Sequence, residues 1–153
     1  MHEFLAWLET SSPAAILRQS AWLYPAANVV HVLALMGFFA AVAAMDFRLL
    51  HSRGLAGARG AVARLRPVAA VLLVVMALSG GALFLPEATH IGHNRFFLFK
   101  LVAIATALAN VAMLEIALRR PGPTFPAILC VSAVASLALW LVVAALGRLI
   151  AYV

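Results

Sequence analysis

The chain alternates between long apolar stretches and short polar connections. Four stretches stand out, at about residues 26–45, 67–85, 96–118 and 125–147. A helix rises about 1.5 Å per residue, so crossing a hydrocarbon core of about 30 Å takes about 20 apolar residues. We therefore predict four transmembrane helices. Because the connections are short, we expect an all-α, up-down four-helix bundle over residues 25–153.

The first 24 residues follow a different pattern. Apolar residues recur there at helical spacing beside acidic ones, at Phe4, Leu5, Leu8, Glu3 and Glu9. Ser12 followed by Pro13 is typical of a helix cap with a proline in the first turn, which indicates a second short helix. Short amphipathic helices lie in the membrane interface and do not span it. We predict that residues 1–24 form an interfacial amphipathic segment that precedes the bundle.

Composition supports a membrane location. Of the 153 residues, 66% are hydrophobic and 10% are charged, whereas a soluble domain is about half apolar and a quarter charged. The net charge of +6 does not indicate a nucleic-acid partner, because basic and aromatic residues are not interleaved on a polar face. A single cysteine, Cys130, excludes an internal disulfide and a CxxC metal site.

The basic residues predict an orientation. Seven of the eleven lie on one side of the predicted membrane, in the connections after the first and third spans: Arg48, Arg53, Arg59, Arg64, Arg66, Arg119 and Arg120. The positive-inside rule places these loops in the cytoplasm of a bacterial inner membrane. Both termini and the loop 86–95 then face outward, toward the periplasm. An aromatic belt is expected on that side, formed by Trp7, Trp22, Tyr24 and Tyr152.

His31 lies about two turns inside the first span, with Asn28 one turn earlier on the same face. An ionisable group in lipid is costly and is a functional candidate by default. One interpretation is an axial haem ligand or a metal or quinone contact. The other is a neutral histidine that bonds a neighbouring backbone carbonyl.

The outer loop "PEATHIGHNRFFLFK" places two more histidines on the same side as His31. His90 and His93 are spaced one helical turn apart. Two imidazoles from different segments can hold one haem iron, and we favour His93 as the partner because it adjoins the third span. The alternative is a solvated loop, and H-x-x-H alone is a weak zinc signal.

Three residues in the second and third spans bear on the same site. Gly80 belongs to "SGG", which permits tight helix packing or leaves room for a flat macrocycle. Lys100 lies one turn inside the third span, where it can snorkel outward or meet a haem propionate. Asn110 lies mid-membrane and is expected to bond across to another helix.

The inner ends of the spans carry a second polar group of residues. Its members are Asp46, Arg48, Arg66, Glu115 and Arg119. Glu115 and Arg119 are four residues apart, which suits an ion pair on a helix. We interpret the group as structural ion pairs that fix the helix ends. A proton entry path or a docking patch is the alternative.

The motifs also carry a family resemblance. His31, Gly37 and then D-x-R-L-L at 46–50, with "SGGALF" and "HNRFFLFK…N", resemble an uncharacterised family of small bacterial four-helix membrane proteins, a domain of unknown function. The similarity covers nearly the whole chain. The family looks distantly similar to four-helix cytochrome b and copper-resistance D membrane domains. This resemblance implies at most one b-type haem here, because only His31 lies clearly within a span.

These observations leave three hypotheses open. The first is a redox subunit with one haem b near the outer face that transfers electrons, with quinol as a candidate donor, to other membrane or periplasmic redox subunits. The second is a cofactor-free anchoring subunit of a larger complex, or a homo-oligomer. The third is a copper-handling protein, although the methionines form no tight cluster. We assign no catalytic residue, because no serine or cysteine nucleophile shares a loop with a base and an acid.

Overall fold

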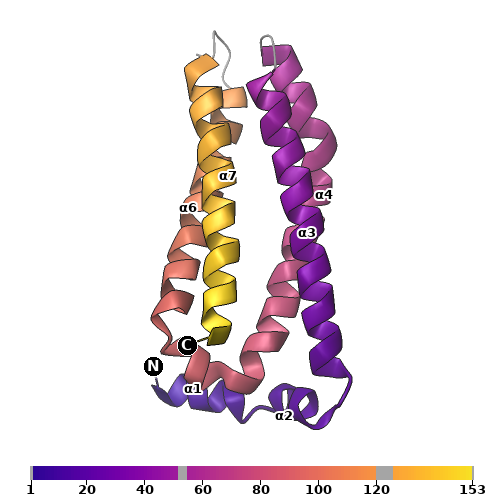
Figure 1. Cartoon of the computed structure of the whole chain (residues 1–153), viewed down its shortest axis with the longest axis vertical. Helices are drawn as coiled ribbons and strands as arrows, with labels where there is room; N and C mark the ends of the chain where they lie inside the picture. The colour runs from indigo at the N-terminus through magenta and orange to yellow at the C-terminus, as the bar shows by residue number, and fades with distance from the viewer. Residues whose placement is uncertain (1, 52–54, 120–125, 153) are drawn as a thin grey trace.

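The computed structural model describes residues 2–51, 55–119 and 126–152, and every regular element in them is helical (Figure 1). Four long helices are α3 (Leu23–Leu50), α4 (Leu55–Phe84), α6 (Arg95–Arg119) and α7 (Pro126–Leu149). The short elements are α1 (His2–Glu9), α2 (Ser12–Gln19), η1 (Leu85–Glu87), α5 (Ala88–Gly92) and η2 (Ile150–Tyr152). Each long helix lies in a segment long and apolar enough to cross a membrane. The predicted all-α four-helix bundle is confirmed.

The long helices form two antiparallel hairpins, α3 with α4 and α6 with α7 (Figure 1). The hairpins are joined mainly through α3 and α7, whereas α4 and α6 meet only sparsely. We call the end covered by α1 and α2 the α1 end, and the opposite end, which carries Arg66 and Arg119, the arginine end. Arg53 and Arg120 of the predicted arginine-rich loops lie outside the described residues.

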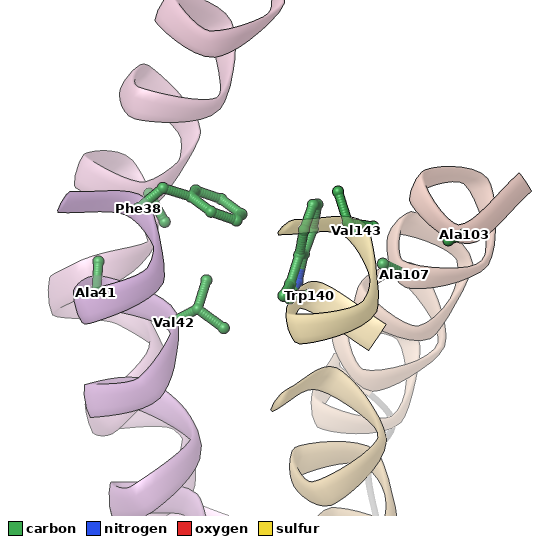
Figure 2. Packing of buried hydrophobic residues seen from close by; sticks show 8 residues of the cluster. Phe38, Ala41, Val42, Ala103, Ala107, Trp140 and Val143 are labelled. Carbon is green, nitrogen blue, oxygen red and sulfur yellow. The ribbon is translucent and has the colours of Figure 1, made fainter. Parts of the chain in front are cut away.

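The core between the hairpins is built on one aromatic pair. The rings of Phe38 on α3 and Trp140 on α7 meet edge to face, with centroids 4.6 Å apart (Figure 2). Val42 and Val143 pack beside them and are buried. Edge-to-face contact places the positive ring edge on the negative face of the partner, which favours this geometry. The pair therefore fixes how one hairpin sits on the other.

Small residues let the helices approach within each hairpin. A Cβ atom at Gly37 of α3 would lie 3.2 Å from Leu72 Cδ1 of α4, so only glycine leaves this space free. Ala103 and Ala107 are buried in the same core and belong to α6 (Figure 2). Small residues at helix interfaces are the usual means of close packing in membranes.

The start of α4 differs from the prediction. The helix begins at Leu55 and not at about residue 67, so Pro67 lies in its interior instead of its first turn. The preceding segment is rich in alanine, leucine and arginine, which are strong helix formers, and their propensity outweighs the polar pattern that suggested a linker. Pro67 has no N–H, so it removes one hydrogen bond from the helix without ending it.

The N-terminal segment forms two short helices across the α1 end, as expected. The backbone N–H of Thr89 donates to Glu9 Oε2 at 2.9 Å, and Arg18 lies 3.9 Å from Glu9 Oε1. Leu5 is buried against Gly92 of α5. The cap of α2 is Ser11 and not Ser12, with Pro13 in the first turn. The segment is thus fastened to α5 by one polar and one apolar contact.

Candidate functional site

A cavity of about 700 Å³ opens between the hairpins at the α1 end. We call it the His31 cavity. Its lining includes every predicted cofactor-binding residue except His93, namely Asn28, His31, Gly80, His90 and Lys100. Sites for cofactors and small molecules typically measure about 300–1,000 Å³. Residues far apart in the sequence therefore meet at a space large enough for such a ligand.

His31 is held by a hydrogen-bonded serine of the neighbouring helix. Ser79 Oγ donates to the Val75 carbonyl at 2.7 Å, and His31 Nδ1 lies 2.9 Å from the same hydroxyl. A hydroxyl has one proton to give, so this network assigns the Nδ1–H of His31 as the donor to Ser79. The Nε2 atom then keeps its lone pair. A hydrogen bond that fixes one ring nitrogen is the usual arrangement of a metal-ligating imidazole.

Gly80 makes room for the His31 ring. A Cβ atom at position 80 would lie 3.2 Å from His31 Cε1, whereas at Gly81 it would meet nothing within 4 Å. The glycine that matters for this ring is therefore Gly80, and its neighbour is free to vary.

Lys100 reaches across the cavity from α6 to α7. A Cβ atom at Gly147 would lie 3.2 Å from Lys100 Nζ, so the absence of a side chain there accommodates the ammonium group. No carboxylate in the described part of the chain forms an ion pair with Lys100. An ammonium group without an ion-pair partner on a cavity wall favours an anionic group in a ligand.

The two loop histidines lie in different surroundings. His90 on α5 lines the His31 cavity, but His93 does not. Helix α5 ends at Gly92, and the His93 ring turns back to donate from Nδ1 to the Thr89 carbonyl at 2.7 Å. The ring centroid of His93 lies 5.5 Å from that of His2 on α1. The structure thus brings His90 to the cavity of His31 and places the favoured partner, His93, beside α1.

Other residues of the cavity wall were not predicted from the sequence to belong to the site. Phe84 and Phe97 stack with centroids 5.1 Å apart at the junction of α4 and α6. Arg148 donates to Tyr152 Oη at 2.7 Å, and Glu87 completes the polar part of the wall. The spacing of Arg148 and Tyr152, four residues apart, was the available signal for that pair.

A second, smaller cavity of about 180 Å³ lies at the arginine end. We call it the Asp46 cavity. Asp46 is 4% exposed, and its Oδ2 has no hydrogen-bond partner. The Ser136 hydroxyl of α7 lies within hydrogen-bonding reach of the same carboxyl group. Asp46 is the buried acidic residue of this part of the bundle.

The predicted ion-pair network at this end is smaller than expected. Glu115 accepts from Arg119 Nε at 2.8 Å and from Arg66 Nη1 at 2.9 Å, which joins α4 to α6. Asp46 and Arg48 form no ion pair within the described ranges. The Asp46 side chain faces the bundle interior, whereas the arginines at this end are exposed on the helix surface and form no ion pair with it in the described ranges.

Asn110 bonds across to another helix, as predicted. Its Nδ2 donates to the Ser132 carbonyl at 3.0 Å, and Ser132 Oγ donates to Asn110 Oδ1 at 3.1 Å. The pair ties α6 to α7. In the described residues, no group of three or more His, Cys, Asp or Glu side chains is placed to hold a bare metal ion.

These features define a class of protein, a multi-pass helical membrane protein with a ligand-sized cavity near one end. A search against models of known protein families, curated proteins and solved structures finds no match.

Proposed function

We propose that this protein is a membrane redox subunit that binds one b-type haem in the His31 cavity. The observation that carries the proposal is that His31 and His90 both line this cavity, with His31 Nδ1 held by Ser79. Two imidazoles, those of His31 and His90, would be enough to hold a haem iron without a third protein ligand. The donor set therefore suits a haem better than a bare metal ion.

The rest of the wall suits the periphery of such a group. Lys100 would balance the charge of a propionate, and Phe84 and Phe97 offer apolar ring surfaces. Gly80 keeps the space around the His31 ring open. A bound haem would exchange single electrons at its iron, while these side chains bind it, orient it and limit its contact with water.

The proposal includes an orientation and a partner. Described arginines crowd the arginine end, so the positive-inside rule supports a cytoplasmic position for it. The His31 cavity then lies near the periplasmic face of a bacterial inner membrane. In that position it suits electron transfer between quinol and a membrane or periplasmic redox subunit.

The test is the reduced-minus-oxidised visible spectrum of protein purified from its native membrane. We expect a b-type band that is lost in H31A and H90A and retained in H93A, the matched control one helical turn away. Retention of the band in H90A with loss in H93A would replace His90 by His93 as the second ligand.

Absence of any b-type band in freshly isolated wild-type protein would refute the redox proposal. Stoichiometric co-purification of colourless partner subunits would then support the anchoring alternative. Copper bound to the purified protein, and lost in H31A, would support the copper-handling alternative.

A further inference from the structure

The Asp46 cavity holds a buried acid that the proposed function does not use. Asp46 is 4% exposed on α3, and its Oδ2 has no partner. Burying a polar atom without a partner is unfavourable, and more so if the atom carries charge. Helix α3 is otherwise mostly apolar. We therefore expect a ligand that binds the unpartnered carboxyl oxygen of Asp46.

The charges around Asp46 come from two neighbouring helices. Arg66 of α4 and Glu115 of α6 line the same cavity, and they are bonded to each other. Helix α7 lines the cavity with Ser136 and Trp140, which carry no charge. Arg48, on the same helix as Asp46, is exposed. Within the described ranges, no cation forms an ion pair with Asp46. The Arg66–Glu115 pair marks the side of the cavity that faces the arginine end.

The cavity is poorly suited to a larger or multiply coordinated ligand. Metal cations with oxygen ligands, such as Ca²⁺ and Mg²⁺, take six or more. Here Asn110 accepts from Ser132 and Glu115 is paired with two arginines, so Asp46 and Ser136 are the remaining side chains with oxygen ligands. A volume of about 180 Å³ is also below the range of about 300–1,000 Å³ for small-molecule sites, but it admits several water molecules. The ligand that matches one carboxyl oxygen and a few waters is a proton.

We propose that Asp46 is a proton-binding site that exchanges protons with the aqueous phase at the arginine end. Oδ2 accepts a proton delivered by water through the Asp46 cavity and returns it by the same route, so no electron moves and no other bond is made. Toward the His31 cavity the path is closed by the rings of Phe38 and Trp140. The inference rests on the Asp46 cavity alone and is independent of haem.

Dicyclohexylcarbodiimide tests this site, because it adds to protonated carboxyl groups in apolar surroundings. The chain has five Asp and Glu residues, so peptide mass spectrometry assigns each adduct. We expect the wild-type protein in lipid nanodiscs to be labelled at Asp46 in preference to the glutamates. Labelling should decrease as the pH rises and be absent in D46N.

E115Q is the matched control, because it replaces a carboxylate of the same cavity that already accepts from two arginines. It should retain labelling at Asp46. Infrared spectra give a second readout: the wild-type protein should show a carboxylic-acid C=O band that shifts in D₂O and is missing in D46N. Absence of an Asp46 adduct at every pH would overturn the proposal, as would labelling that does not change with pH. If D46N does not fold, the wild-type peptide map alone decides.

Discussion

At the scale of single residues, the polar side chains within the bundle are mostly matched to partners on a neighbouring helix. His31 bonds Ser79, and Asn110 bonds Ser132, each across a helix pair. Lipid supplies no water to satisfy such groups, so the protein must satisfy them itself. Among the described residues, Lys100 forms no ion pair and Asp46 Oδ2 has no hydrogen-bond partner, and each lines one of the two named cavities.

Two adjacent glycines allow a direct test of the His31 environment. We expect G80A to lower stability by about 1–3 kcal/mol, because the new methyl group crowds the His31 ring. G81A should leave stability unchanged or raise it by up to about 1 kcal/mol, since alanine is the better helix former and meets open space. Unfolding in detergent micelles measures both. Equal effects of the two substitutions would show that position 80 does not constrain His31.

At the scale of elements, the polar contact that docks the N-terminal helices onto α5 is made by one carboxylate, that of Glu9. Hydrogen bonds from Thr89, assisted by Arg18, hold the pKa of Glu9 below its ordinary value of 4.5. A lowered folded-state pKa means that the contribution of Glu9 to docking is fully present above pH 4.5. It is lost as the pH falls through the folded-state value.

The backbone amide resonance of Thr89 reports this contact by NMR. We expect it to titrate in the acid range as Glu9 takes up its proton and the N–H loses its charged acceptor. E9Q should abolish the titration. E3Q should preserve it, because Glu3 of the same helix is exposed and forms no ion pair in the described ranges. A Thr89 titration that survives in E9Q would contradict the assignment.

Element types could be predicted from the sequence, but some boundaries and rotations could not. Length and apolar content are local properties, so the four long helices follow from them. The start of α4 depends on helix propensity in an arginine-rich segment, where hydropathy misleads. The choice between His90 and His93 depends on where α5 ends, and the burial of Asp46 depends on how α3 is rotated against its neighbours. The end of α5 and the rotation of α3 depend on contacts between helices, which the pattern of one sequence does not reveal.

At the scale of the whole molecule, two hairpins share one main interface. α3 and α7 form it, and α4 and α6 meet only sparsely. The Phe38–Trp140 contact lies in this interface, with Trp140 only 3% exposed. Lipid chains are as apolar as the side chains, so the interface depends on close packing more than on removal of water.

Removing the tryptophan tests this dependence. We expect W140A to lower the free energy of unfolding by about 3–5 kcal/mol, because it leaves a cavity between the hairpins. L141A should change it by less than about 0.5 kcal/mol, since Leu141 is 56% exposed and faces outward. Titration of mixed micelles with a denaturing detergent measures both variants. A similar loss in both would mean that the hairpins are not held together at this contact.

The order in which the helices are synthesised determines when the two cavities can form. α3 and α4 are neighbours in sequence, as are α6 and α7, whereas the α3–α7 contact joins the first long helix to the last. α7 also supplies Gly147 to one cavity and Ser136 to the other. A nascent chain that has inserted only three of its long helices therefore has neither cavity. Any ligand that occupies either cavity must therefore bind after α7 has inserted.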